Sequence, residues 1–221
     1  MQQILVYGDS LSWGIIPDTR RRLAFPQRWP GVLEAGLLAE GVQVRVLEDC
    51  LNGRRTVWDD PFKPGRKGLE GLAQRIEAQS PLALVILMLG VNDFQSMHPH
   101  RAWHAAQGVA ALVQAVRLAP IEPGMPVPPV LIVAPPPLSE PAGAIAPKFD
   151  GGQHKCVGLA QELQSVAEGL GCGYVDAGRL CRTSAIDGVH LDADQHLALG
   201  QAMCAEVRPY LARAPRVQVP P

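Results

Sequence analysis

The chain begins MQQILVYGDSLSWG (residues 1–14), where an apolar run over Ile4–Tyr7 stops at Gly8-Asp9-Ser10. The run predicts the first strand of the protein, and the residues after it favour a turn. Glycine tolerates a positive φ there, whereas aspartate and serine hydrogen-bond nearby backbone groups. Such a turn would also expose the hydroxyl group of Ser10 at the edge of a sheet. On this stretch alone the turn is the favoured interpretation, and the rest of the chain decides whether the hydroxyl group is also reactive.

Further along the chain, short apolar runs alternate with longer amphipathic segments. Continuous apolar runs are typical of strands that are buried on both faces, as in a parallel sheet covered by helices. The predicted strands are Ile4–Tyr7, Val42–Leu47, Leu82–Leu89, Val130–Ala134 and Tyr174–Val175. The predicted helices are Gln27–Glu40, Leu69–Gln79, Arg101–Leu118, Gln153–Leu170 and Ala193–Leu211. This alternation predicts one open, doubly wound α/β layer structure.

The length and the loops of the chain bound its organisation. A chain of 221 residues is expected to form a single domain over residues 1–221, and it is long enough to bury a core without disulfide or metal staples. Residues 54–68 and 119–152 are long connections rich in proline and glycine, which predicts functional loops. The tail 211–221 is predicted either to be mobile or to pack on a partner.

Charge and cysteine usage exclude several classes of protein. The formal net charge is −1, which gives no electrostatic footprint for nucleic acid or an anionic membrane. The longest apolar run, Leu82–Leu89, is far shorter than the ~20 residues of a membrane span. The five cysteines contain no CxxC pair, and no export signal is recognisable. We therefore expect a cytoplasmic protein with no nucleic-acid or membrane partner.

The residues that follow the predicted strands carry the parts of an acyl-transfer site, because ligands of open α/β sheets bind at the carboxyl ends of the strands. A serine such as Ser10 needs a general base, and an imidazole such as that of His190 suits neutral pH. Asp187, three residues earlier, would fix the tautomer of this imidazole. The backbone N–H groups of Ser10 and Gly53 and the side-chain amide of Asn92 are candidate oxyanion donors.

Each of these residues alone also has a structural interpretation, because glycine and asparagine after strands usually form turns and a histidine near a helix start is usually structural. Asp192 followed by Gln195 fits a capping pattern at the start of the last helix, but this leaves the Asp-His pair unexplained. Asp9 is assigned to the turn. His100 and His104 have the i,i+4 spacing of a metal pair. No carboxylate or cysteine lies at matching spacing, so no metal site is predicted.

Together these residues resemble the SGNH, or GDSL, hydrolase family. The four blocks of the family are matched by Gly8-Asp9-Ser10-Leu11-Ser12, Gly53, Gly90-Val91-Asn92-Asp93 and Asp187-Gly188-Val189-His190. The resemblance implies a flavodoxin-like three-layer α/β sandwich with a five-stranded parallel sheet. It implies Ser10 as nucleophile, His190 as base, Asp187 as the acid that orients it, and Ser10, Gly53 and Asn92 as the oxyanion hole. It implies neither a metal nor a cofactor.

Further motifs resemble one subgroup, the bacterial arylesterases that include acyltransferases and perhydrolases. These motifs are GDSLSWG, Arg28-Trp29, WDDP at Trp58–Pro61, MLGVND at Met88–Asp93, PPPL at Pro135–Leu138 and FDGG at Phe149–Gly152. The resemblance implies a homo-oligomer that narrows the site entrance, an octamer being one assembly that it admits. Asn52 stands where the subgroup often has serine, and Ile15 where an aromatic residue is expected. The side chains predicted to bind substrate are Leu11, Trp13, Ile15, Asn52, Val91, Phe149 and Val189.

The sequence thus predicts a serine esterase that hydrolyses short-chain aryl or alkyl esters through an acyl-enzyme. Acyl transfer and perhydrolysis are side reactions that the resemblance admits. A thioesterase, a lysophospholipase and a carbohydrate acetylesterase are alternatives that would use the same site. A carbohydrate- or lipid-binding module with an inactive site is a further alternative, against which the intact set of site residues argues.

Overall fold

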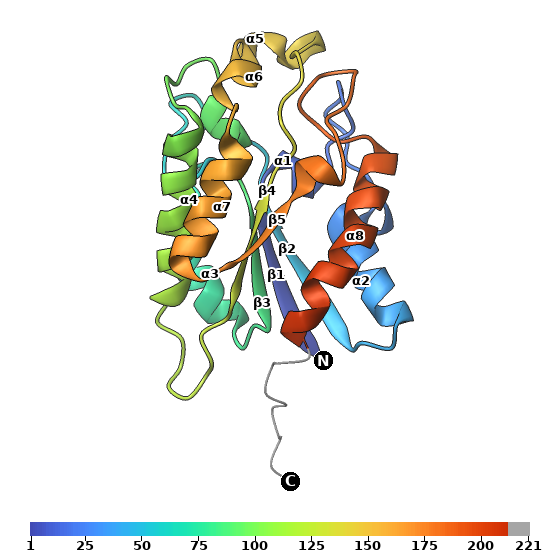
Figure 1. Cartoon of the computed structure of the whole chain (residues 1–221), viewed down its shortest axis with the longest axis vertical. Helices are drawn as coiled ribbons and strands as arrows, with labels where there is room; N and C mark the ends of the chain where they lie inside the picture. Colours follow the sequence, from blue (N-terminus) through green and yellow to red (C-terminus); the bar gives the residue numbers. More distant parts are fainter. Residues whose placement is uncertain (212–221) are drawn as a thin grey trace.

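The computed structural model describes residues 1–211, which form a five-stranded parallel sheet between two layers of helices (Figure 1). The strand order is β2-β1-β3-β4-β5, the order of flavodoxin-like folds. The strands are β1 (Gln2–Gly8), β2 (Val44–Cys50), β3 (Leu84–Met88), β4 (Val130–Ala134) and β5 (Gly173–Asp176). The predicted parallel α/β sheet is confirmed.

The first three strands end level with one another. Gly8, the last residue of β1, pairs with Cys50 at the end of β2 and with Met88 at the end of β3. The chain leaves β1 towards β2 on one side and later returns to β3 on the other side, which makes the β1/β3 boundary the switch point of the sheet. Ligands of open α/β sheets bind in the crevice at such a point. The segments after these strands are therefore brought to one edge.

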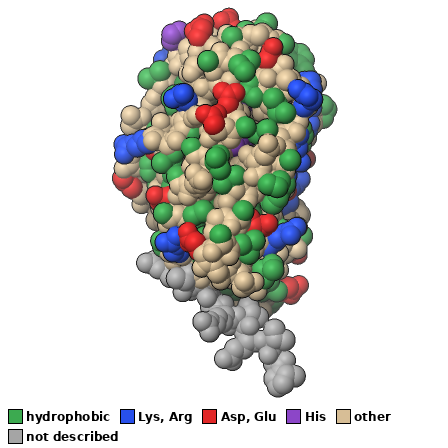
Figure 2. Space-filling model, turned by 90° about the vertical axis from the view of Figure 1, so that its right-hand side faces the viewer, with side chains coloured by type: hydrophobic (Ala, Val, Ile, Leu, Met, Phe, Trp, Pro, Cys, Tyr) green, Lys and Arg blue, Asp and Glu red, His purple; other side chains and the backbone are tan. Residues whose placement is uncertain are grey.

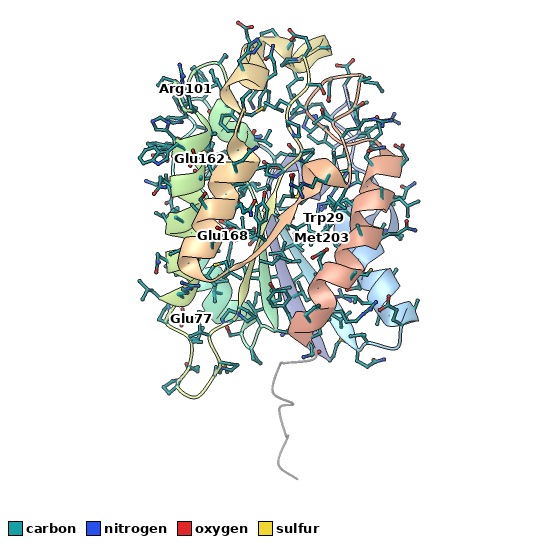
Figure 3. All side chains as sticks on the ribbon, in the orientation of Figure 1. Trp29, Glu77, Arg101, Glu162, Glu168 and Met203 are labelled. Carbon is teal, nitrogen blue, oxygen red and sulfur yellow. The ribbon has the colours of Figure 1, made fainter. Side chains whose placement is uncertain are left out.

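Helices cover both faces of the sheet, because every residue of β3 and β4 is buried and apolar and needs cover on both sides. α2 (Trp29–Ala39) and α8 (Ala193–Leu211) form one layer, and α3 (Leu72–Gln79), α4 (Ala102–Arg117) and α7 (Leu159–Leu170) form the other (Figure 1). Figure 3 shows Trp29 and Met203 between the sheet and the first layer, where both side chains are fully buried. The labelled charged residues Glu77, Arg101, Glu162 and Glu168 belong to the second layer, that of α3, α4 and α7.

The edge strand β2 differs from its prediction. It was expected over Val42–Leu47, but it runs from Val44 to Cys50. Glu48 and Asp49 near its end are polar, yet they pair through their backbone with Val6 and Tyr7. Their side chains form ion pairs instead of packing in the core: Asp49 binds Arg54, and Glu48 binds two further arginines. An edge strand tolerates such residues, which an apolar pattern cannot reveal.

Other boundaries shift where glycine or short helices intervene. The predicted helix Gln153–Leu170 is split into α6 (Gly152–Lys155) and α7, because Gly158 takes a φ of 88° that no α-helix contains. Two four-residue helices were not predicted: α1 (Ser10–Trp13) and α5 (Ala146–Phe149), the latter inside the expected loop 119–152. The bounds of β4 and α8 agree with the prediction, and the remaining elements differ by one to three residues.

The structure also bears on two sequence predictions: that no segment spans a membrane and that no charged patch dominates the surface. Within residues 1–211, no helix combines the length and hydropathy that crossing a membrane requires. Basic and acidic side chains are interspersed on the face shown in Figure 2, as the near-zero net charge leads one to expect. The predicted single domain and cytoplasmic location stay predictions. The prediction for the tail falls almost wholly on residues 212–221, which lie outside the described part of the chain.

The contact between α2 and α8 yields a test of the packing. A Cβ added at Gly200 in α8 would lie 2.5 Å from Val32 Cβ and 2.7 Å from the Trp29 carbonyl oxygen. Gly200→Ala must therefore push the two helices apart, and we expect it to lower the free energy of unfolding by about 1–3 kcal/mol. Urea unfolding followed by circular dichroism measures this change.

Gly169→Ala in α7 is the matched control. A Cβ at this helical position would meet no atom within 4 Å. Because alanine favours a helix over glycine by about 0.5–1 kcal/mol, this variant should be as stable as the parent or slightly more stable. Equal losses of stability in the two variants would contradict the packing described for α2 and α8.

Candidate active site

The turn after β1 places Ser10 at the first residue of α1. The Asp9 carboxylate accepts a hydrogen bond from the Leu11 N–H (2.9 Å) and so caps this short helix. Position 8 requires glycine, since a Cβ there would lie 2.6 Å from Ser12 Oγ. Gly14, with a φ of 84°, ends the helix after a single turn. The local sequence thus fixes the Ser10 hydroxyl at the carboxyl edge of β1.

Ser10, His190 and Asp187 form a continuous hydrogen-bonded chain. His190 Nε2 lies 3.1 Å from Ser10 Oγ, and His190 Nδ1 lies 2.7 Å from Asp187 Oδ2. The second oxygen of Asp187 accepts the backbone N–H groups of Val189 and His190, both at 2.9 Å. The structure therefore brings together the three side chains that the sequence predicted. A carboxylate in this position fixes the imidazole with its Nε2 towards the hydroxyl group.

The charge state of Asp187 follows from these contacts. Burial opposes the ionisation of this carboxyl group, but the hydrogen bonds and the charge of His190 outweigh it, with help from the backbone N–H groups. The pKa of Asp187 is thereby lowered to about 2. Asp187 is thus ionised at neutral pH and is able to stabilise a positive charge on the imidazole ring.

The turn that carries Asp187 and His190 is locked against the segment that follows β4. The Ser139 N–H donates to the Gly188 carbonyl oxygen, and the Ala142 N–H donates to that of Asp187. Gly188 has a φ of 73°, and a Cβ there would lie 2.3 Å from the Glu140 carbonyl oxygen. Only glycine fits this close approach. The spacing of Asp187 and His190 is therefore fixed by backbone packing.

Ser10, Gly53 and Asn92 line one cavity, and each carries an N–H group that could donate to an oxyanion. Asn92 lies in η2 (Val91–Phe94), a 3-10 helix directly after β3, and its amide is held on two sides. Its Nδ2 donates to Asp9 Oδ2 (3.0 Å), and its Oδ1 accepts from Gln95 Nε2 (2.7 Å). Within residues 1–211, the backbone N–H groups of Ser10 and Gly53 donate to no acceptor. Such free, fixed donors suit a tetrahedral intermediate.

Asp9 has a second function that the sequence interpretation missed. Besides capping α1, it orients the Asn92 amide and so joins the turns after β1 and β3. Burial raises the pKa of Asp9 to about 6, against the hydrogen bonds from Leu11 and Asn92. In the strand order of the structure, β1 and β3 are neighbours, so the residues that follow them meet at the switch point. No strand order was predicted from the sequence.

Asp93, the neighbour of Asn92, tethers the loop 54–68 to the end of β3. It accepts the Thr56 N–H at 3.0 Å and the Thr56 hydroxyl at 2.5 Å. Burial raises the pKa of Asp93 to about 7 despite these hydrogen bonds. In the same loop the buried guanidinium of Arg55 pairs with Asp60 at 2.7 Å. These contacts hold the loop 54–68, and with it the preceding Gly53, beside the site.

The cavity above Ser10 has a volume of about 270 Å³. Of the side chains predicted to bind substrate, Ile15, Asn52 and Phe149 line it, whereas Leu11, Trp13, Val91 and Val189 do not. Leu11 and Val189 are buried in the core, Trp13 lies under the Arg22 guanidinium, and Val91 lines a second cavity of about 360 Å³. Proximity in sequence to a catalytic block therefore did not predict where these four side chains point.

Other lining residues escaped the sequence interpretation. They are Asp18, Thr19, Arg20, Lys63, Ala144, Ile145 and Lys148. The last four come from the two loops that were expected to be functional. The first three lie between α1 and α2, where no pattern marked them. Asp18 also has a positive φ of 52°, its N–H donates to Asp187 Oδ2 (3.2 Å), and its Oδ1 accepts the Ala144 N–H (3.1 Å).

His100 and His104, the pair that was weighed as metal ligands, do not line the cavity above Ser10. His100 stacks on Trp58 and on His98, with ring centroids 4.0 and 4.8 Å apart. Burial and the neighbouring histidines lower the pKa of His100 to about 4. In the described chain, no group of three or more His, Cys, Asp or Glu side chains is placed to hold a metal ion.

Comparisons with known proteins agree with this geometry. A model of the GDSL-like lipase/acylhydrolase family matches residues 6–200. A carbohydrate acetylesterase family member from Sinorhizobium meliloti is 38% identical, with a TM-score of 0.89 over 96% of this chain and 100% of that chain. The native aryl esterase of M. smegmatis is 34% identical, with a TM-score of 0.89 over 95% and 100%.

A putative arylesterase from Agrobacterium tumefaciens is 38% identical, with a TM-score of 0.84 over 95% of this chain and 100% of that chain. A search of the curated proteins found no match. The chain is thus similar to ester hydrolases over nearly its whole length.

The raised pKa of Asp93 predicts a pH effect on stability. Between its usual value of 3.8 and about 7, this group is protonated in the folded chain and ionised in the unfolded chain. Its contribution to stability therefore falls as the pH rises through this interval. Asp93→Asn removes the titration, so the stability of the variant relative to the parent should increase from about pH 5 to about pH 8. Urea unfolding at both pH values measures the difference.

Asp59→Asn serves as the control, because Asp59 is a largely exposed carboxylate in the neighbouring loop. Its relative stability should change little with pH. A relative stability of Asp93→Asn that is the same at both pH values would contradict a protonated Asp93 in the folded chain.

Proposed function

The chain belongs to the GDSL-like lipase/acylhydrolase family, the SGNH hydrolases, and on that premise we propose that it hydrolyses short-chain carboxylic esters with Ser10 as the nucleophile. It is a carboxylic ester hydrolase, like its aryl esterase and acetylesterase relatives. The observation that carries the proposed roles is the chain of hydrogen bonds from Ser10 Oγ through His190 to Asp187.

The first half-reaction uses this chain of contacts directly. Ser10 Oγ attacks the ester carbonyl carbon while His190 Nε2 accepts the hydroxyl proton, and Asp187 stabilises the imidazolium that forms. The tetrahedral intermediate then collapses, the bond to the alcohol oxygen breaks, and His190 returns the proton to that oxygen. The alcohol leaves, and the acyl group remains on Ser10 as an ester.

The second half-reaction repeats these steps with water. Water attacks the acyl carbon, His190 takes its proton, and the same proton returns to Ser10 Oγ as the acid leaves. In both steps, the N–H groups of Ser10 and Gly53 and the amide of Asn92 donate to the developing oxyanion. Asp9 holds the Asn92 amide in place before the substrate arrives.

The dimensions of the cavity support a short acyl chain. Its volume of about 270 Å³ lies at the low end for small-molecule sites, and its apolar lining is limited to a few side chains such as Ile15, Ile145 and Phe149. This argues against a lysophospholipase or a thioesterase for long acyl chains. A carbohydrate acetylesterase is the second candidate, because two relatives carry that description and acetyl is the shortest stable acyl group of this kind.

The test of the proposed roles is steady-state kinetics with p-nitrophenyl acetate. Ser10→Ala should keep the fold and lose nearly all activity, and His190→Ala should be comparably impaired. Because the two side chains act as one unit, the double variant should be no worse than either single one. A Ser10→Ala enzyme that keeps a substantial fraction of kcat/KM would contradict Ser10 as nucleophile, and additive losses would contradict a shared step.

We also propose that the acyl-enzyme transfers part of its acetyl group to alcohols or hydrogen peroxide in water, and that the chain forms a homo-oligomer that narrows the entrance. The buried side chains of Phe149 and Ile15 support the proposed acyl transfer, since apolar walls favour an acceptor with a carbon skeleton over water. The enzyme is incubated with an acetate ester and a primary alcohol in buffer. The fraction of acetyl groups transferred to the alcohol should exceed the mole fraction of the alcohol in the solvent. A transferred fraction at or below that mole fraction would indicate plain hydrolysis. A monomeric mass in light scattering would contradict the proposed homo-oligomer.

A further inference from the structure

The mouth of the catalytic cavity carries three cationic side chains, Arg20, Lys63 and Lys148. They come from segments that are far apart in the sequence. Arg20 lies between α1 and α2, Lys63 lies in the loop 54–68, and Lys148 lies on α5 (Figure 1). The net charge of the chain is only −1, so this excess of positive charge is local.

None of the three side chains is neutralised by a neighbour. Within residues 1–211, the Arg20 guanidinium and the two lysine ammonium groups form no ion pair and no hydrogen bond. Asp60 is the acidic group that acts on both lysines, and it is already paired with Arg55. By contrast, Arg22 and Arg28 nearby share the carboxylate of Glu48. The cavity mouth is thus charged without a partner in the described chain.

Of the residues that the structure describes, two carboxylates line the same cavity, and both are already hydrogen-bonded. Asp187 is bound by the His190 ring and by the backbone N–H groups of Asp18, Val189 and His190. Asp18 accepts the Ala144 N–H. Within residues 1–211, neither carboxylate forms an ion pair with Arg20, Lys63 or Lys148, and the three cations outnumber the two carboxylates.

The neighbouring charges act on one another. Burial lowers the pKa of Lys148, and the charges of Arg55, Lys63 and Arg20 lower it further against the opposing effect of Asp60. Burial, Arg66 and Arg20 likewise lower the pKa of Lys63. An anion between these groups would relieve this repulsion, because opposite charge favours the ionised form.

Burial distinguishes the two parts of the cavity. Ile15 and Phe149 are buried at its inner wall, whereas Arg20 and Lys63 are exposed at its mouth. An ester that reacts with Ser10 would therefore place its short acyl chain against the apolar wall. The alcohol part would extend past the cations towards the solvent.

We propose that the natural substrate is an ester whose alcohol part carries an anionic group, a carboxylate or a phosphate, which Arg20, Lys63 and Lys148 bind. This inference rests on the proposed esterase function and names the substrate class of the same site. Charge-assisted hydrogen bonds from lysine or arginine to such a group are stronger than neutral ones and raise both affinity and the rate of encounter.

Two matched pairs of acetate esters test the inference. The first pair is 3-acetoxybenzoate and its neutral methyl ester. The second pair is acetylglycerol phosphate and acetylglycerol. For each pair, the ratio of kcat/KM for the anionic ester to kcat/KM for the neutral ester is measured and corrected for uncatalysed hydrolysis. A ratio above about five at low ionic strength that falls with added salt is expected for at least one pair, and the pair that shows it identifies the anion.

Substitutions of the lining lysines then test whether these cations cause the preference for the anionic ester. Lys148→Gln and Lys63→Gln should each lower the ratio towards one by about two- to fivefold, because each removes one contact of a partly exposed charge. Lys148→Arg keeps the charge and should retain most of the ratio. Arg21→Gln is the matched control: it removes one charge from the exposed neighbour of Arg20, outside the cavity, and should leave the ratio unchanged.

The possible outcomes separate this inference from the proposed function. Ratios near one for both pairs, or ratios that Lys148→Gln and Arg21→Gln change equally, would overturn the anionic substrate. In that case the loss of activity in Ser10→Ala would still support the esterase. An active Ser10→Ala enzyme would instead overturn the esterase mechanism itself.

Discussion

The level ends of β1, β2 and β3 are the constraint on which the site depends. Gly8 pairs with Cys50 on one side and with Met88 on the other, so the turns after these strands must meet at one edge of the sheet. The hydrogen bond between Asp9 and Asn92 then joins two of these turns across the switch point. A shift of one residue in this register would separate Ser10 from Asn92 and turn every strand side chain to the opposite face.

Burial determines the electrostatics of the site, and it acts differently on neighbouring carboxyl groups. Asp9 and Asp93 are held by neutral hydrogen-bond donors, and burial raises the pKa of each. Asp187 is buried too, but the contact with His190 lowers its pKa to about 2. Asp9 and Asp93 thus fix turns, while the ionised Asp187 is placed to support the proton transfer that we propose. The free energy lost by burying Asp9 and Asp93 is the cost of rigid turns around the site.

The sequence located Ser10, Asp187 and His190 because their positions follow from strand ends and from one tight turn, both of which leave local patterns. It did not locate the lining of the cavity, which depends on contacts between distant segments. Leu11 follows Ser10, yet the single turn of α1 directs it into the core. Lys148 lies in an irregular loop whose helix α5 has no periodic signal, and only tertiary packing carries it to the cavity. Such side-chain directions are a property of packing and cannot be obtained from spacing.

The central claim is that one serine, Ser10, becomes covalently acylated. A fluorophosphonate that reacts with activated serines, followed by proteolysis and mass spectrometry, measures this directly. The account predicts a single label on Ser10, which does not form after His190→Ala because the hydroxyl group then lacks its base. Ser12 donates to Met88 and accepts from Trp29 in the core, and it should remain unmodified. A label on Ser12 or on any other serine, with Ser10 unmodified, would contradict the account.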